Sequence, residues 1–409
     1  MTVIDNPPAL NRPRSPMLGL IVVGLLLAAL NLRTAVTSIG PVLSEIQNGL
    51  SMSSTVAGVL TTLPVICFAA LGGLTPALVR RFGDRSVLLM ALLAMAVGLI
   101  VRACVSSVAV FLLASGFALA GGAVGNVAIP TIVKHHFPDR VGALTTAYSA
   151  ALAVGAMLAA SLTVPLENLT GEWRWALGLW AVLAVVAMLP WLFLPKTERA
   201  TTPTTTDDRI RGVARSRLGW MTMIAFGTQS IIAYVMFGWL PEMMRGHGYS
   251  AAQAGVMLGV FTAISIPISI IIPVMAARRP TQHHILVVLC SSYFVGLPAM
   301  WLGGYSIITW IGLVLVAVAM GTFPLLLTLF VLRTRTSAGT AALSGFAQGG
   351  GYLLAAAGPL LVGILYDATG DWSAAFVILL VTAAVHMVAG WTTVGDRFIE
   401  DEVPGPAAG

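Results

Sequence analysis

The sequence predicts an all-α integral membrane protein with twelve transmembrane helices in two pseudo-symmetric six-helix bundles. Three observations support this fold class: the composition, a series of long apolar runs, and an internal repeat. Of the 409 residues, 57% are hydrophobic and only 9% are charged, which is typical of chains built mostly from membrane-spanning helices. The net charge of +6 does not indicate nucleic-acid binding, because the basic residues gather between the apolar runs.

Apolar runs of about 20 residues, enough to cross a bilayer as a helix, recur twelve times along the chain. The expected spans are 17–43, 55–79, 86–104, 107–133, 141–165, 175–195, 218–240, 251–276, 285–303, 306–332, 340–364 and 374–395. Most loops between them are short, but residues 196–217 are rich in threonine and charge, as in a flexible linker. We therefore expect an N-terminal half (1–195), a cytoplasmic linker (196–217) and a C-terminal half (218–409).

The positions of Lys and Arg predict the orientation in the membrane. If the N-terminus is inside, 18 of the 22 basic residues lie on the inner side. Only Arg102, Arg174 and Arg245 then lie outside, and Arg33 falls within a helix. Because cytoplasmic loops carry an excess of Lys and Arg, we expect a multi-pass protein of the cell inner (plasma) membrane with both termini cytoplasmic (N-in/C-in).

Short segments of the first half recur in the second. The tripeptide AGV at Ala57–Val59 returns at Ala254–Val256, and Pro76 returns as Pro273, both after 197 residues. The segment TGEW at Thr170–Trp173 returns as TGDW after 199 residues. Two parallel six-helix halves are the layout of a rocker-type transporter, in which the substrate site lies at mid-membrane between the halves.

The loop after the second run, RRFGDRSVLL, resembles the signature loop of the major facilitator superfamily, and the resemblance covers nearly the whole chain. It implies the major facilitator fold and a gating role for the charged residues Arg80, Arg81, Asp84 and Arg85. The loop departs from the usual motif at Arg80, where Asp is common, so the usual gating salt bridge is in doubt. Membrane anchoring explains basic residues at this helix end equally well.

A narrower resemblance rests on five stretches in both halves. These are NLRTAVTSIGPVL, GVLTTLPVICF, GNVAIPTIVKHHFPDRVG, FGWLPEMMRGHGYS and AALSGFAQGGGYLLAAAGPLL, and they look like the cyanate permease and nitroimidazole transporter branch. The resemblance implies a single-chain secondary transporter of a small compound. It fixes neither the compound nor the direction of transport.

Arg33 lies within the first apolar run, roughly 15 Å from its outer end and 24 Å from its inner end at about 1.5 Å per residue. A charge at this depth costs at least about 2.5–3.5 kcal/mol and needs compensation. Thr37 shares its helix face, but no Asp or Glu falls in the middle of any run. We infer that the substrate supplies negative charge or strong acceptors. The alternative is a structural arginine bonded to carbonyls freed by prolines.

Other polar residues inside the runs are further candidates for substrate contact. Asn126 lies four residues before a proline, which frees the Asn126 carbonyl. Gln229 and Tyr234 are the polar members of the seventh run. Gln348 and Tyr352 lie one turn apart on one face of the eleventh run, where they suit either a cavity lining or an interhelical hydrogen-bond seam.

These features predict a secondary active or facilitative transporter that works by alternating access. The expected substrate is a small anionic or strongly polar solute, such as cyanate or a small carboxylate. Two alternatives stay open: an exporter of neutral aromatic compounds such as nitroimidazole-like drugs, and a membrane sensor that does not transport. We expect no enzyme, cofactor or metal site, because the sequence has no P-loop, HExxH or GxSxG motif. The expected partners are the substrate and the lipid bilayer, with the chain acting as a monomer.

Overall fold

The computed structural model describes residues 15–72, 74–194 and 212–402. Within these ranges the chain forms helices and turns and no strand, and twelve helical segments are long and apolar enough to cross a membrane. This confirms the predicted fold class. Residues 195–211, most of the predicted linker, lie outside the described part of the chain.

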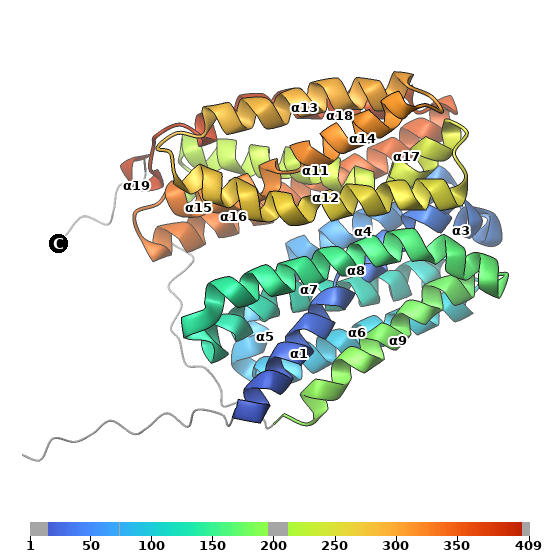
Figure 1. Ribbon diagram of the computed structural model, residues 1–409, viewed down its shortest axis with the longest axis horizontal. Helices are drawn as coiled ribbons and strands as arrows, with labels where there is room; N and C mark the ends of the chain where they lie inside the picture. The colour runs from blue at the N-terminus through green and yellow to red at the C-terminus, as the bar shows by residue number, and fades with distance from the viewer. Residues whose placement is uncertain (1–14, 73, 195–211, 403–409) are drawn as a thin grey trace, which may run out of the picture.

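The helices group into two bundles, coloured blue to green and yellow-green to red in Figure 1. The first contains α1 (Ser15–Asn31), α2 (Thr34–Thr37), the 3₁₀ turn η1 (Gly40–Val42), α3 (Leu43–Leu50), α4 (Ser54–Gly72), α5 (Thr75–Phe82), α6 (Asp84–Cys104), α7 (Val108–His136), the 3₁₀ turn η2 (Pro138–Arg140), α8 (Val141–Thr170) and α9 (Trp173–Leu192). The second contains α11 (Arg217–Gly246), α12 (Ala251–Ala277), α13 (His283–Leu302), α14 (Ile307–Ala319), α15 (Thr322–Leu332), α16 (Ser337–Ala355), α17 (Ala357–Thr369), α18 (Ser373–Thr393) and α19 (Ile399–Glu402).

Three of the spans are interrupted within the membrane. The first span, Leu18–Leu50, is longer than the predicted run and breaks at residues 32–33, between α1 and α2. The tenth breaks between α14 and α15, and the eleventh breaks at Ala356, between α16 and α17. Such breaks leave backbone polar groups that only protein or a water-filled cavity can satisfy at this depth. Each break therefore marks a position where backbone groups need hydrogen-bond partners from outside their own helix.

Arg102 donates hydrogen bonds to polar groups just after the break in the first span. The sequence places Arg102 at the outer end of the third run (86–104), and in the structure it lies in the last turn of α6 and is fully buried. Its Nη1 donates to the Ala35 carbonyl at 3.2 Å, and its Nη2 donates to Ser38 Oγ at 3.1 Å. Arg102 thus has the structural role that was the alternative for Arg33.

The two halves pack closely through small residues. A Cβ atom at Gly363 of α17 would lie 2.3 Å from the Ser54 carbonyl oxygen of α4, and one at Gly259 of α12 would lie 2.0 Å from Ser161 Oγ of α8. A Cβ at Gly40 of η1 would lie 2.8 Å from a backbone oxygen of α11. These contacts need glycine, as in close helix packing within membranes.

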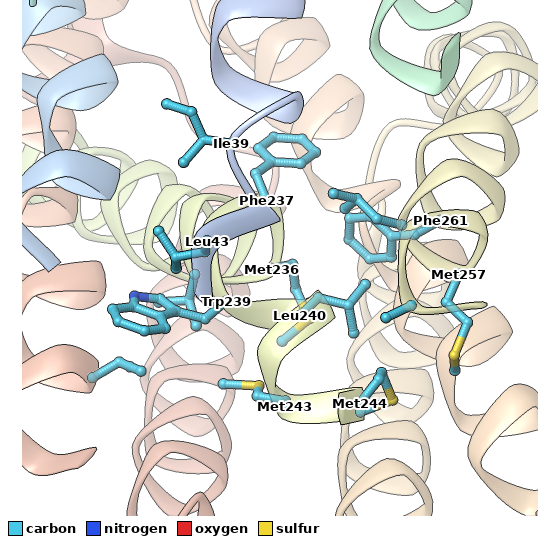
Figure 2. Close-up of a cluster of buried hydrophobic side chains, with 14 of the residues drawn as sticks. Ile39, Leu43, Met236, Phe237, Trp239, Leu240, Met243, Met244, Met257 and Phe261 are labelled. Carbon is cyan, nitrogen blue, oxygen red and sulfur yellow. The ribbon is translucent and has the colours of Figure 1, made fainter. Parts of the chain in front are cut away.

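An apolar core continues this contact between the first span and α11. Figure 2 shows Ile39 and Leu43 of the first span beside Phe237 and Trp239 of α11, with methionines of α11 below them. The two residues of the first span and the two rings of α11 are all buried in one hydrophobic cluster. The part of the first span that follows Arg33 is therefore sealed against the second half in this conformation.

Polar contacts reinforce the seal. Ser44 Oγ donates to Glu242 Oε2 at 2.5 Å, and Arg245 Nη1 lies 2.9 Å from Glu45 Oε1. Arg245 also lies 3.4 Å from Glu242 within α11. Glu45 and Glu242 are separated by the same 197 residues as the repeated AGV segment, so the two halves place equivalent carboxylates on one shared arginine.

A second polar contact joins α17 to the first turn of α4. The Asp367 carboxylate accepts hydrogen bonds from Ser54 N at 2.9 Å and from Thr55 N at 2.6 Å. Apart from a bond from Thr62 to the Ala356 carbonyl, every hydrogen bond between the halves in the described residues lies in these two contacts. We call this region the closed end. It lies by α3, opposite the end at which α1 begins and α19 lies (Figure 1).

Candidate functional site

Arg33 lies at the break of the first span, about midway between Leu18 and Leu50. It precedes α2, and its side chain is partly exposed although it lies inside the bundle. In the described part of the chain, the guanidinium has no hydrogen bond and no ion pair. Its carbon Cζ lies over the Phe237 ring, 5.4 Å from the centroid, in a cation–π contact. Arg33 therefore differs from Arg102, whose two Nη atoms donate hydrogen bonds within the protein.

A row of aromatic rings leads away from Arg33, and we call it the aromatic strip: Phe68, Tyr234, Phe237 and Tyr352. The Phe237 and Tyr234 centroids are 6.0 Å apart, and those of Tyr234 and Tyr352 are 6.5 Å apart. Phe68 lies 6.5 Å from Tyr234 and stacks on Tyr352 at 5.6 Å. Because Phe68 belongs to α4 and the other three to α11 and α16, the strip joins the two halves.

Three of the four residues of the strip are partly exposed. Phe68, Tyr234 and Tyr352 are all partly exposed, as Arg33 is, whereas Phe237 is buried beneath the guanidinium. The two phenol hydroxyls have no hydrogen-bond partner among the described residues. The structure thus brings the predicted residues Arg33, Tyr234 and Tyr352 into one polar and aromatic surface.

Asn126 and Gln348 lie on helices that flank this surface. Asn126 is partly exposed and follows Gly125, where a Cβ would lie 2.5 Å from Leu32 Cδ2 at the break of the first span. Gln348 is also partly exposed, one turn before Tyr352, and its Nε2 donates to Ser344 Oγ at 2.6 Å. Their contact with substrate stays a prediction.

Gln229 and Thr37 have protein partners instead. Gln229 is fully buried, and its Oε1 accepts from the Tyr293 hydroxyl at 2.8 Å and from Thr322 Oγ1. Thr37 is also buried and donates to the Ala156 carbonyl at 3.1 Å. The polar face expected along the first span is therefore buried against other helices at Thr37, after Arg33. In this conformation neither side chain reaches the accessible surface, and their role in substrate binding stays a prediction.

The basic residues of the signature loop stay within the first half. Arg85 donates from Nε to the Trp191 carbonyl at 2.7 Å and from Nη2 to the Leu192 carbonyl at 3.0 Å. Cations at the end of α9 are favourable, because the last carbonyls of a helix carry partial negative charge. Arg80 and Arg81 are exposed. The gating role of this loop stays a prediction.

Asp84 of the same loop is buried against the end of α7. Its Oδ2 lies 3.0 Å from His135 Nδ1 and 3.8 Å from His136 Nε2. The potential ligand atoms of these three residues lie within 4.8 Å of one another, a spacing that could hold a metal ion. Sequence motifs gave no sign of this group, because Asp84 is remote in sequence from the histidine pair.

Comparison with known proteins agrees with this geometry. The sequence-family model described as Major Facilitator Superfamily matches residues 23–356. The chain belongs to the major facilitator superfamily. This membership and the fold make it a multi-pass membrane transporter of that superfamily and not an enzyme.

Three relatives match over most of their length. The chain is 36% identical over 384 residues to the uncharacterized transporter YycB of Bacillus subtilis (strain 168), which covers 93% of this chain and 94% of YycB. It is 33% identical over 383 residues to the 2-nitroimidazole transporter of Escherichia coli (strain K12), with 93% and 96% covered. It is 29% identical over 360 residues to the cyanate transport protein CynX of the same organism, with 85% and 90% covered. The last two confirm the expected branch.

Solved structures show the same fold. A bacterial homolog of the human lysosomal transporter Spinster, in an inward-facing and occupied conformation, superimposes with a TM-score of 0.77. The match covers 94% of this superfamily member and 99% of the other chain at 15% identity. At this identity the likeness supports the architecture alone.

Sequence reasoning missed Phe68 and Phe237. Both are apolar residues in apolar runs, where rings facing lipid, core and cavity look alike. The one available signal was the position of Phe237, three residues after Tyr234, which puts both on one helix face. Phe68 carried no comparable signal.

Proposed function

We propose that this superfamily member moves a small anionic or strongly polar solute, such as cyanate or a small carboxylate, by alternating access. One observation carries the proposal: the Arg33 guanidinium is partly exposed between the halves and has no carboxylate partner in the described residues. A charge at mid-membrane depth requires compensation. Guanidinium donors match the planar, two-oxygen geometry of a carboxylate. A bound anion therefore supplies what the protein lacks.

The proposal includes an inner-membrane location with both termini in the cytoplasm. The burial of Arg102 supports this orientation, because it leaves only Arg174 and Arg245 among the expected outer basic residues. In this orientation the closed end faces outward, and the site communicates with the cytoplasm. Both halves of the site come from one chain, which supports action as a monomer. Uniport, exchange and symport with the proton carried on the substrate are all compatible with this arrangement.

A second function, export of neutral aromatic compounds, is favoured by the aromatic strip. The relative named as a 2-nitroimidazole transporter supports a substrate with an aromatic ring. This function would depend on the rings and not on the Arg33 charge. A sensor without transport is disfavoured, because the relatives are named as transporters.

Uptake into proteoliposomes tests the proposal. The substrates are labelled cyanate and a panel of small carboxylates, compared between the wild type, Arg33→Lys and Arg33→Ala. We expect uptake of at least one anion by the wild type and its loss in both variants, which should still insert into the membrane. Normal uptake by the variants would refute the role of Arg33.

A further inference from the structure

The four side chains of the aromatic strip do not form a closed apolar core. Three of them are partly exposed beside an arginine that is itself partly exposed. In a site for simple anions, the surface beside the cation needs only small or polar residues. Here the surface beside the cation is made of aromatic rings, which continue from Phe237 to residues of α4 and α16.

We infer that the substrate is a planar aromatic anion, with its carboxylate on Arg33 and its ring against the aromatic strip. This inference rests on the proposed function and names its substrate class. Aromatic rings prefer centroid separations of about 4.5–7 Å. The strip residues already lie 5.6–6.5 Å apart, so a ring entering beside Phe68 and Tyr352 meets faces and edges at favourable spacing.

The phenol hydroxyls add a second polar feature. Tyr234 and Tyr352 each have a hydroxyl without a hydrogen-bond partner among the described residues. A hydroxyl can donate one hydrogen bond and accept others. Both tyrosines belong to the strip, so their hydroxyls suit a hydroxyl or nitro substituent on the ring. A hydroxybenzoate or nitrobenzoate would then use Arg33 and at least one tyrosine together.

The position of the strip also couples ring binding to alternating access. Phe68 belongs to the first half and Tyr352 to the second, and their rings stack on each other at an interplanar angle of 28°. A ligand ring that touches both residues bridges the halves. Cyanate has three atoms and no ring, so it can pair with Arg33 but cannot stack on Phe68. We therefore expect cyanate to bind more weakly than an aromatic carboxylate.

Equilibrium binding to the purified full chain tests the inference, with labelled benzoate as the probe. Unlabelled cyclohexanecarboxylate is the matched competitor, because it has the same carbon count and charge but no π system. The wild type should prefer benzoate by about 2- to 12-fold for each strip ring that the benzoate ring packs against. Phe68→Leu and Tyr352→Leu should reduce this preference and leave cyclohexanecarboxylate affinity nearly unchanged. The control is Phe117→Leu, whose ring is 52% exposed on α7 and lies outside the strip; it should keep the preference.

The outcomes separate this inference from the proposed function. If both carboxylates bind equally and Arg33→Gln abolishes binding of both, the proposed function stands and the aromatic inference is overturned. If neither benzoate nor cyclohexanecarboxylate binds, the aromatic inference is overturned, and uptake of labelled cyanate decides the proposed function. If the preference survives in both Leu variants, the ring is recognised elsewhere and the aromatic strip is not the site. The wild-type comparison needs no variant, so a folding defect in a variant does not prevent a decision.

Discussion

Arg33 and Arg102 are two intramembrane arginines with opposite environments, and substituting each by Gln should separate binding from stability. Arg102 is fully buried and donates to Ala35 O and Ser38 Oγ. Each hydrogen bond from a charged group contributes about 1.5–3 kcal/mol, so Arg102→Gln should lower the free energy of unfolding by about 3 kcal/mol or more. With about 2 °C per kcal/mol for a chain of this size, the melting temperature should fall by about 6 °C.

Arg33→Gln should not lower the stability. The Arg33 side chain loses no hydrogen bond within the described residues, only a cation–π contact of about 0.5–1 kcal/mol with Phe237. Removing a charge from mid-membrane offsets that loss, because such a charge costs at least about 2.5 kcal/mol. The substitution should instead weaken anion binding by about 10- to 100-fold, the value of one or two charge-assisted hydrogen bonds.

The assay combines thermal unfolding in nanodiscs with anion binding for the same preparations. We expect Arg102→Gln to lose stability while its remaining folded fraction still binds, and Arg33→Gln to lose binding without a fall in melting temperature. A fall of several degrees for Arg33→Gln would refute the reasoning, because it would mean that Arg33 holds the helix break together as Arg102 does.

Three other predictions concern the closed end and the docking of α19. Asp367→Asn weakens hydrogen bonds across the closed end. A cysteine placed at buried Thr61 should then react faster with an impermeant maleimide added from the side of the closed end. An unchanged reaction rate would contradict the role of the Asp367 contact. Gly363→Val places a side chain against Ser54 O, 2.3 Å from the new Cβ, and should hinder closure and cut uptake at least tenfold, whereas normal uptake would show that the halves need not approach there. Burial raises the pKa of Glu402, but hydrogen bonds from the first residues of α11 outweigh burial and leave this pKa below its usual range. The resulting stabilisation is complete above the pKa of Glu402 in the unfolded chain and is lost as the pH falls through its pKa in the folded chain. The acid-side drop in melting temperature should therefore shrink in Glu402→Gln, and an identical pH profile for wild type and variant would exclude this role of Glu402.

The number and type of helices could be predicted because each span must satisfy its own backbone and cover about 30 Å of bilayer. This constraint acts locally, so apolar runs revealed it. The break at Arg33 was not predicted, because no proline or glycine occurs beside residues 32 and 33. Its stability depends on Arg102, which lies 67 residues beyond its partner Ala35 and was counted with the outer basic residues.

The residues of the site were predictable where a charged or polar residue type is unusual inside an apolar run. Arg33 stood out as a charge, and Tyr234 and Tyr352 as polar groups in apolar runs. Phe68 did not stand out, because a phenylalanine in an apolar run is common whether it faces lipid or a cavity. Gln229 was polar for a different reason, since it binds Tyr293 and Thr322 in the second half. Residue type alone does not distinguish an internal hydrogen-bond partner from a ligand.

The most direct test of the Arg33 site is to locate a bound aromatic anion that carries a heavy atom. A crystal of the full chain soaked with 4-iodobenzoate gives an anomalous signal at the iodine and density for the carboxylate. We predict the carboxylate within hydrogen-bond distance of the Arg33 guanidinium, and the iodine between α4 and α16 near Phe68 and Tyr352. An ordered iodine peak at another place between the halves, with Arg33 making no contact to the carboxylate, would contradict the account.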